Sequence, residues 1–422
     1  MARTTAAAAQ TTDGAQVAWV VATPSGQQLV GVAPDGSTVG QIDATNKAIL
    51  RSPDGAIFYA LSSRSNGDTS MAIIEMYSAA TGSLQQTITG WALPLGNARG
   101  FDALDAMSSP DGRSLALLHQ TSYIVTPAAY QVTKKDRKGG TRTISIDATT
   151  IINGVEVIDL AGARSLDYFK LDDAPDNLLG GQVVFAPDGA SLYAFTAAGS
   201  FTPSVTAIQF DGKGLHTRGR ATDGQNGRVV SRGAAALRAE THVQPDSRTL
   251  VRVVGPTVEW FDLQNLTVSG TVDLPAPPAP ALAKPTRPAT LFSPDGSRLY
   301  VVDTAEGAVG AVDLVQRAKF GSVTLPGIGA SPLAGAQGAV LSPDGTRLYA
   351  LQSDGLAVVS LPNLTVIGHW LPGVALRAVR LSRDGQTMFA VGLTDNRVYV
   401  LGADGHAINA VQFAMSVYSF AA

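Results

Sequence analysis

Apolar, strand-like runs recur along the chain, and each follows a short polar turn. Residues 293–296 (Ser-Pro-Asp-Gly) precede the apolar run 299–302, and the same four residues at 342–345 precede the run 348–351. This order of Ser, Pro, Asp and Gly favours a type I turn. Both faces of the following runs are apolar, so each strand must be buried on both sides. The pattern predicts an all-β fold, a β-propeller in which radially stacked blades cover one another.

The turn recurs seven times with some variation, and the chain between successive turns divides into four short strands. In the clearest unit we expect these strands at 289–293, 298–303, 308–314 and 319–325. The Asp of each turn can accept hydrogen bonds from backbone N–H groups two residues on, so we interpret it as a turn builder and not as part of a catalytic cluster. The seven turn aspartates are Asp54, Asp111, Asp188, Asp246, Asp295, Asp344 and Asp384.

The two ends of the chain carry the parts of an eighth blade. Runs at 17–21, 28–32 and 37–42 supply three strands without an inner one, and 416–420 is a single strand of the inner type. Joining the N- and C-terminal strands closes the ring and removes exposed sheet edges. A seven-bladed ring would leave 416–420 without a partner. We therefore predict one propeller of four-stranded antiparallel blades, with eight blades favoured over seven, preceded by a flexible leader over residues 1–12.

The repeat resembles a known family. Residues 291–303 (Leu-Phe-Ser-Pro-Asp-Gly-Ser-Arg-Leu-Tyr-Val-Val-Asp) are similar to the YVTN-type bacterial propeller repeats; copies at 341–351 and 184–195 match well, and those at 243–251 and 381–391 are degraded. These repeats are related to WD-repeat and lactonase-type propellers. The resemblance spans nearly the whole chain and implies the fold. Members of the family include extracytoplasmic binding proteins, surface-layer components and some enzymes, so it implies little about activity.

Composition narrows the classes of function. The 422 residues are 45% apolar, enough for one large core, and the net charge of −3 argues against nucleic-acid binding. The chain contains no cysteine, which excludes disulfides, thiolate metal sites and thioether-linked haem, and we expect no cofactor. No run approaches the roughly 18 apolar residues of a membrane span. The Ala/Thr-rich leader and the family resemblance favour an extracytoplasmic location, whether periplasmic, secreted or on the cell surface.

Three insertions depart from the repeat, and all three are expected on one face of the propeller. The segment 123–153 contains two alternating runs around a basic stretch that includes Lys134 and Lys135, and this predicts a projecting β-hairpin. The segments 219–236 and 275–288 are expected as long loops. They add Arg228, Arg232 and Arg287 to a basic rim, which would attract an anionic partner; the alternative interpretation is that these side chains are simply solvated.

Polar residues also interrupt the inner strands. Six positions before the turn aspartate stand Asp105, Gln182 and Glu240, in the same three consecutive blades as the insertions. Two positions further on, where other blades have apolar residues, stand His242 and Arg380. We take these five as ligand-binding candidates at the mouth of the central channel. Ordinary polar lining of a water-filled channel is the competing interpretation.

These features favour a non-enzymatic binding or assembly propeller. The insertion-bearing face would hold a protein, a glycan or an anionic ligand, and the hairpin could mediate self-assembly. The alternative is a lactonase-like or metal-dependent hydrolase at the channel mouth, with Asp105 and Glu240 as carboxylates and His242 as base. No local motif specifies catalytic residues or a metal-ligand set.

Overall fold

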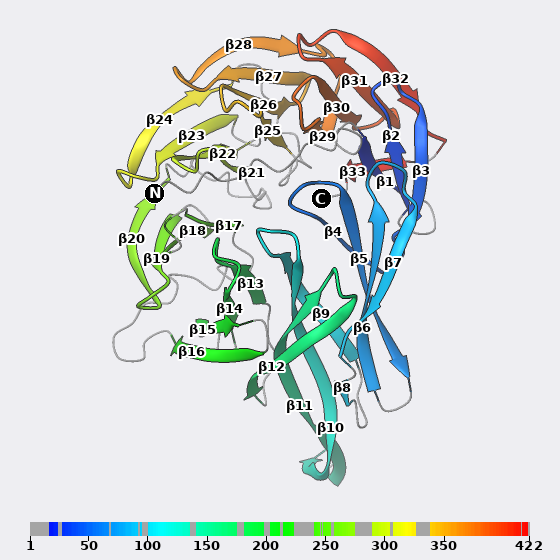
Figure 1. Ribbon diagram of the computed structural model, residues 1–422, viewed down its shortest axis with the longest axis vertical. Helices are drawn as coiled ribbons and strands as arrows, with labels where there is room; N and C mark the ends of the chain where they lie inside the picture. The colour runs from blue at the N-terminus through cyan, green and yellow to red at the C-terminus, as the bar shows by residue number, and fades with distance from the viewer. Residues whose placement is uncertain are drawn as a thin grey trace.

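The computed structural model describes residues 17–23, 28–66, 69–91, 93–94, 100–135, 141–174, 181–197, 203–211, 214–222, 240–244, 246, 248–254, 257–274, 289–303, 307–325, 338–414 and 416–420. Throughout these residues the regular structure is β-strand, arranged as eight antiparallel sheets around a ring (Figure 1). The fold is an eight-bladed β-propeller, as predicted, and the seven-bladed alternative is wrong.

Each blade has four strands from the inside of the ring outward. Blade 1 consists of β33 (Ser416–Phe420), β1 (Ala18–Thr23), β2 (Gln28–Val32) and β3 (Thr38–Asp43). Blade 2 consists of β4 (Ala48–Arg51), β5 (Ile57–Asn66), β6 (Thr69–Ser78) and β7 (Leu84–Thr89). Blade 3 consists of β9 (Gly100–Ser108), β10 (Ser114–Lys135), β11 (Thr141–Asp159) and β12 (Arg164–Ala174). Blade 4 consists of β13 (Gly181–Phe185), β14 (Ser191–Ala197), β15 (Pro203–Phe210) and β16 (Leu215–Thr222).

The second half of the ring repeats this order. Blade 5 consists of β17 (Glu240–Val243), β18 (Thr249–Val254), β19 (Thr257–Asp262) and β20 (Thr267–Asp273). Blade 6 consists of β21 (Ala289–Phe292), β22 (Arg298–Asp303), β23 (Ala308–Asp313) and β24 (Ala318–Thr324), each within one residue of its predicted bounds. Blade 7 consists of β25 (Ala339–Leu341), β26 (Arg347–Gln352), β27 (Gly355–Ser360) and β28 (Thr365–Trp370). Blade 8 consists of β29 (Leu376–Leu381), β30 (Thr387–Gly392), β31 (Arg397–Gly402) and β32 (Ala407–Gln412).

The core lies between blades. Each of eight hydrophobic clusters joins two neighbouring blades, and together they run around the whole ring. The second strand of a blade is therefore buried on both faces; every residue of β30, for example, is buried. This arrangement explains why the runs behind the turns carry apolar residues at consecutive positions.

The ring is closed by pairing of strands from the two ends of the chain. β1 pairs antiparallel with β33, with Val20 opposite Phe420 and Thr23 opposite Ser416. Blade 1 packs on both neighbours: Val20 joins the cluster with blade 8, and Trp19 lies edge-on to Phe58 of blade 2, with ring centroids 5.7 Å apart. The predicted closure is confirmed.

The turns follow the geometry that their sequence predicts. Gly55, Gly112, Gly189, Gly296, Gly345 and Gly385 have φ between 67° and 72°, a conformation that favours glycine. In the turn of blade 6, Asp295 accepts hydrogen bonds from Ser293 Oγ (2.6 Å) and Ser297 N (3.0 Å). These bonds lower the pKa of Asp295 to about 2. The turn aspartates are held within their own turns.

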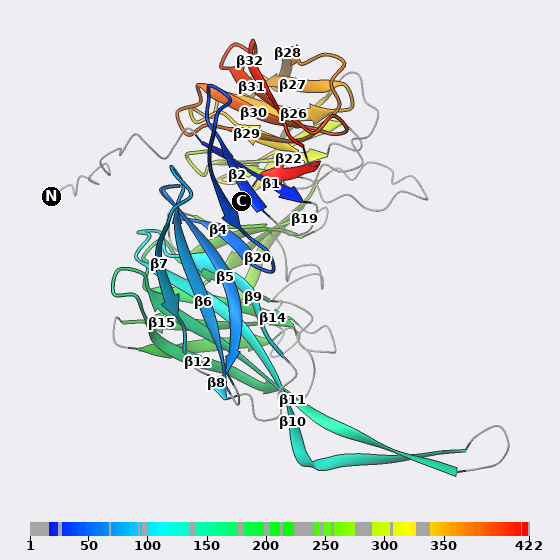
Figure 2. The same ribbon diagram turned by 90° about the vertical axis from the view of Figure 1, so that its right-hand side faces the viewer.

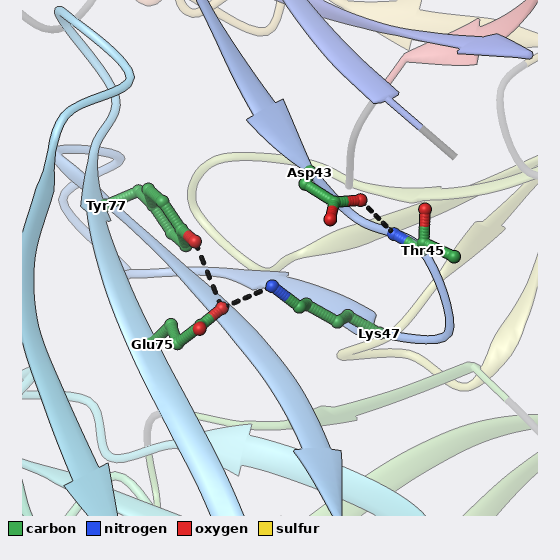
Figure 3. A network of polar contacts seen from close by, with 5 residues as sticks. All are labelled: Asp43, Thr45, Lys47, Glu75 and Tyr77. Atoms are coloured by element: carbon green, nitrogen blue, oxygen red, sulfur yellow. Dashed lines mark hydrogen bonds and ion pairs between the residues drawn. The ribbon is translucent and has the colours of Figure 1, made fainter. Parts of the chain in front are cut away.

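The connection between blades 1 and 2 is fixed by a polar network (Figure 3). Thr45 N donates to the carboxylate of Asp43 (3.0 Å), where the chain leaves β3. Lys47 Nζ lies 2.5 Å from Glu75 Oε2 on β6, and Tyr77 OH donates to the same oxygen at 3.0 Å. These contacts fix the connection as it leaves β3 and hold its last residue, Lys47, against β6 of blade 2. Blade 2 also has a fifth strand, β8 (Leu93–Pro94), which pairs with β6 and was not predicted.

Candidate functional site

β10 and β11 continue beyond blade 3 as a two-stranded arm. β9 pairs with β10 as far as Ser122, and β12 pairs with β11 from Ile151 onward. Past these residues β10 and β11 pair with each other over 123–135 and 141–150, with an irregularity between Val125 and Tyr130. Figure 2 shows the arm extending well away from the propeller body. The two alternating runs of the predicted hairpin are thus paired strands.

The arm and the Ser-Pro-Asp-Gly turns lie on opposite faces of the propeller. β10 begins just after the turn at 109–112 and runs across the blade before it enters the arm. Because neighbouring strands of a blade are antiparallel, turns between first and second strands all lie on one face. Connections between second and third strands, including the arm, lie on the other. We call these the turn face and the arm face.

The predicted basic rim is only partly described by the structure. Lys134 and Lys135 end β10 at the far end of the arm, where their backbones pair with Arg142 and Thr141. Residues 219–222 of the segment expected as a loop over 219–236 belong to β16, and the rest of that segment lies outside the described residues, as does 275–288. Also outside the described residues are Arg228, Arg232 and Arg287.

Three of the predicted inner residues make contacts between neighbouring blades. Asp105 Oδ2 accepts a hydrogen bond from Val183 N at 2.8 Å, which joins blade 3 to blade 4. Gln182 Nε2 donates to Thr241 Oγ1 at 3.1 Å, which joins blade 4 to blade 5. The ring of His242 stacks on Phe292 of blade 6, with centroids 4.5 Å apart. These contacts form a row across the inner strands of four blades.

The other two candidates are Glu240 and Arg380. Glu240 is the first residue of β17, and its backbone pairs with Val253. Arg380 is on β29 of blade 8, far around the ring. The sequence pattern therefore places Asp105, Gln182 and His242 in one row, but it does not bring Arg380 to them.

Burial shifts the pKa of two groups in the row. It raises the pKa of Asp105 to about 6, although hydrogen bonds from Val183 N and Ala106 N act in the opposite direction. It also lowers the pKa of His242, so this ring is neutral at pH 7. Asp105 is half-buried and not freely solvated, in contrast to our expectation for a channel lining. The row therefore contains a neutral imidazole and a carboxylate, and each already contacts a neighbouring blade.

Arg380 lines a pocket beside the closure blade. The pocket has a volume of about 280 Å³ and lies between the turns of blades 2 and 8. Arg51 and Arg383 line it together with Arg380. Burial, and to a smaller extent the nearby Arg51, lower the pKa of Arg380 to about 10, so this guanidinium remains charged at neutral pH. Sequence reasoning identified Arg380 but not the other two arginines.

A buried ion pair and a buried His–Glu contact were also missed. Arg252 Nη2 lies 2.8 Å from Glu259 Oε2, both side chains are almost fully buried, and the guanidinium lies 4.9 Å from the ring centres of Phe195 and Phe261. His119 Nε2 lies 2.8 Å from Glu156 Oε2 in blade 3. In both pairs the partners occupy adjacent strands, so the signal in the sequence was polar residues inside apolar runs.

The described residues hold neither a metal-ligand cluster nor a membrane-spanning helix. Within them, no three His, Asp or Glu side chains gather as a metal ion would require. Nor does this part of the chain contain a helix of the length and apolar character needed to cross a membrane.

Comparison with known proteins shows the fold alone. No protein-family model matches the chain, and no curated protein matches its sequence. The solved structure of dihydro-heme d1 dehydrogenase NirN in complex with DHE is similar, with a TM-score of 0.57, 12% identity and coverage of 94% of this chain and 73% of that one. Sqt1 of Chaetomium thermophilum, bound to the N-terminus of ribosomal protein L10, has a TM-score of 0.49, 12% identity and 88% coverage of each chain.

A 6-phosphogluconolactonase-like structure from Bacteroides fragilis has a TM-score of 0.44, 14% identity and coverage of 98% of this chain and 99% of that one. At these identities the likeness shows the fold and does not decide the function.

Proposed function

We propose that this protein is a non-enzymatic docking propeller whose arm binds another protein. The observation that carries the proposal is the two-stranded extension of β10 and β11 beyond blade 3. Among the described strands, 123–135 and 141–150 pair with each other and lie beyond the pairing with β9 and β12. Their backbone edges offer hydrogen-bonding groups that a partner's strand can pair with, a common mode of protein recognition.

The inner row supports binding over catalysis. Asp105, Gln182 and His242 each contact a neighbouring blade. A hydrolase would need such groups directed at a substrate, and a metal-dependent one would need converging ligands. The hydrolase alternative predicts turnover of lactone or ester substrates that is lost in Asp105→Asn; the docking proposal predicts no such turnover.

The arm is tested by a replacement and a site-specific cross-linker. Exchanging 131–145 for a short Gly-Ser link should leave the melting temperature within about 1 °C, because 131–135 and 141–145 lie beyond the part of β10 and β11 that pairs with β9 and β12. Light scattering should then show loss of self-association or of a bound partner. A photo-reactive residue at Val132 should give a discrete cross-linked product, whereas the same residue at Ile408, exposed on outer strand β32, should not. Unchanged assembly and no product at Val132 would refute the docking role.

We further propose that the repeats are of the YVTN type and that the protein acts outside the cytoplasm. The repeat residues 291–303 support the first point, and the occurrence of that repeat in extracytoplasmic proteins supports the second. Fractionation of cells that produce the native protein tests the location.

A further inference from the structure

Turns of neighbouring blades pack against one another on the turn face. A Cβ placed on Gly345 would lie 3.0 Å from Cδ of Pro294 in the preceding turn. One placed on Gly385 would lie 2.8 Å from Cδ of Pro343. The proline of one turn thus fits against the glycine of the next, and such contacts leave little room between them.

The closure blade interrupts this series of turns. Its inner strands β33 and β1 come from opposite ends of the described chain, so no Ser-Pro-Asp-Gly turn joins them. The pocket of about 280 Å³ lies at this position. Val17, Ala18 and Phe389 supply apolar lining, and the remaining lining residues come from 51–55 in blade 2 and 380–383 in blade 8.

Arg383 spans the interruption. It occupies the position that proline holds in the turns of blades 6 and 7. Its Nη1 donates a hydrogen bond to the carbonyl oxygen of Asp54, so the turn of blade 8 reaches the turn of blade 2 across blade 1. Proline could not make this contact because it lacks a side-chain donor. Arginine therefore replaces the turn proline in the blade next to blade 1, whose two inner strands no such turn joins.

Arg51 and Arg380 replace residues that are mostly apolar at the same repeat positions. Arg51 Nε donates to Gly55 O at 3.0 Å, and its guanidinium lies 5.2 Å from the ring centre of Phe58. Within the described part of the chain, the two terminal nitrogens of Arg51 make no hydrogen bond. Those nitrogens form the flat fork that suits an oxyanion.

The lining carries an excess of positive charge. Three arginines and one aspartate line the pocket. The aspartate, Asp54, accepts hydrogen bonds from Ser52 Oγ (2.6 Å) and Ala56 N (3.0 Å) within its own turn. Burying positive charge costs free energy, and burial lowers the pKa of both Arg51 and Arg380. A bound anion would offset this cost.

We propose that this pocket binds a small organic molecule through a phosphate or carboxylate group. A volume of about 280 Å³ is near the lower end of the range of ligand pockets, roughly 300–1,000 Å³. The apolar lining from Val17, Ala18 and Phe389 would contact the body of such a molecule, while the guanidinium groups hold its charged end. The pocket is on the turn face, so this proposal is independent of the arm and of its partner.

The full chain is titrated with inorganic phosphate and, separately, with citrate at constant ionic strength. Calorimetry should show saturable binding of at least one of them at one site, and thermal unfolding should shift upward in its presence. Arg380→Gln and the exposed Arg383→Gln should each weaken binding at least about tenfold, because each removes a charge-assisted contact. Arg113→Gln is the matched control: it removes an exposed arginine on the same face, 82% accessible in its side chain, and should change affinity less than about twofold.

The two anions distinguish the ligand classes, and two results would overturn the proposal. Phosphate binding without citrate binding would identify a phosphate ester as the ligand class, and the reverse would identify a carboxylate. Absence of saturable binding of both anions to the native chain would overturn the proposal. Equal weakening by Arg113→Gln and Arg383→Gln would also overturn it, because the effect would then reflect net charge and not this site.

Discussion

Two sides of the inner ring use polar residues in opposite ways. Across blades 3 to 6, Asp105, Gln182 and His242 each contact the neighbouring blade, so their polar groups hold the ring together. Around blades 8, 1 and 2, Arg51 and Arg380 line a pocket instead. Where each blade has its turn between the first and second strands, polar residues of the inner strands contact the neighbouring blade. Beside blade 1, whose two inner strands no such turn joins, they line a pocket and are candidate ligand residues.

The surroundings of two arginines, the buried Arg252 and the half-buried Arg380, show the same difference. Arg252 has a carboxylate from Glu259 at 2.8 Å and two aromatic rings about its guanidinium. Arg380 shares its surroundings with two further arginines and one aspartate. The charge of Arg252 is thus balanced by a carboxylate of its own blade, whereas the proposed anion would offset the positive charge around Arg380.

The largest effect is expected at the closure. Deleting 416–422 should lower the free energy of unfolding by about 5 kcal/mol, because it removes buried Val417 and uncovers the apolar edge of β1. Urea denaturation measures the change. Val417→Ala should cost about 2 kcal/mol by loss of buried methyl groups, and serves as the graded control. A deletion variant with unchanged stability and dispersity would show that closure does not stabilise the ring.

A smaller loss is expected on the opposite side. Glu259→Gln should cost about 3 kcal/mol, because it leaves the buried Arg252 guanidinium without its counter-charge. Replacing the pair together, Arg252→Met with Glu259→Leu, should recover most of the loss. Denaturation of the three variants measures both effects. Equal destabilisation by the single and double changes would mean that packing and not charge is responsible.

Asp105→Asn should stabilise the protein at neutral pH. The folded pKa of about 6 lies above the ordinary 3.8, so the ionised form is disfavoured in the folded state. Folded protein therefore takes up a proton between pH 6 and pH 4 that unfolded protein does not, and the penalty is full above pH 6 and absent below pH 4. The variant should gain about 2 kcal/mol at pH 7 and nothing at pH 4. Denaturation at both pH values measures the gain; a pH-independent difference would contradict the assignment to ionisation.

The smallest effect is expected from Arg383→Pro, which restores the common turn sequence. It removes the exposed hydrogen bond to Asp54 but restricts the unfolded chain, so stability should change by less than about 1 kcal/mol. Anion affinity, measured by calorimetry, should nevertheless fall with the lost guanidinium. A large loss of stability would show that Arg383 chiefly holds the ring together.

The fold could be predicted because its determinants are local. The turn at 293–296 and the following run, apolar on both faces, specify a blade without reference to distant residues. The single strand at 416–420 required only a partner strand, which the run at 17–21 supplies. The pocket could not be predicted in this way. Arg383 and Asp54 are 329 residues apart and meet only when blade 1 is in place. Arg380 was identified because it breaks the repeat, whereas the contacts of Asp105 depend on how adjacent blades are aligned.

Closure by strands from distant parts of the chain has a consequence for synthesis. β1 emerges from the ribosome early, and its partner β33 emerges only after the seven other blades have been made. Until then the inner edge of β1 is available to any strand nearby, including that of another nascent chain. Folding must also bring together residues almost a full chain length apart, which makes this step slow. Mispairing of β1 during this interval would therefore prevent closure of the ring.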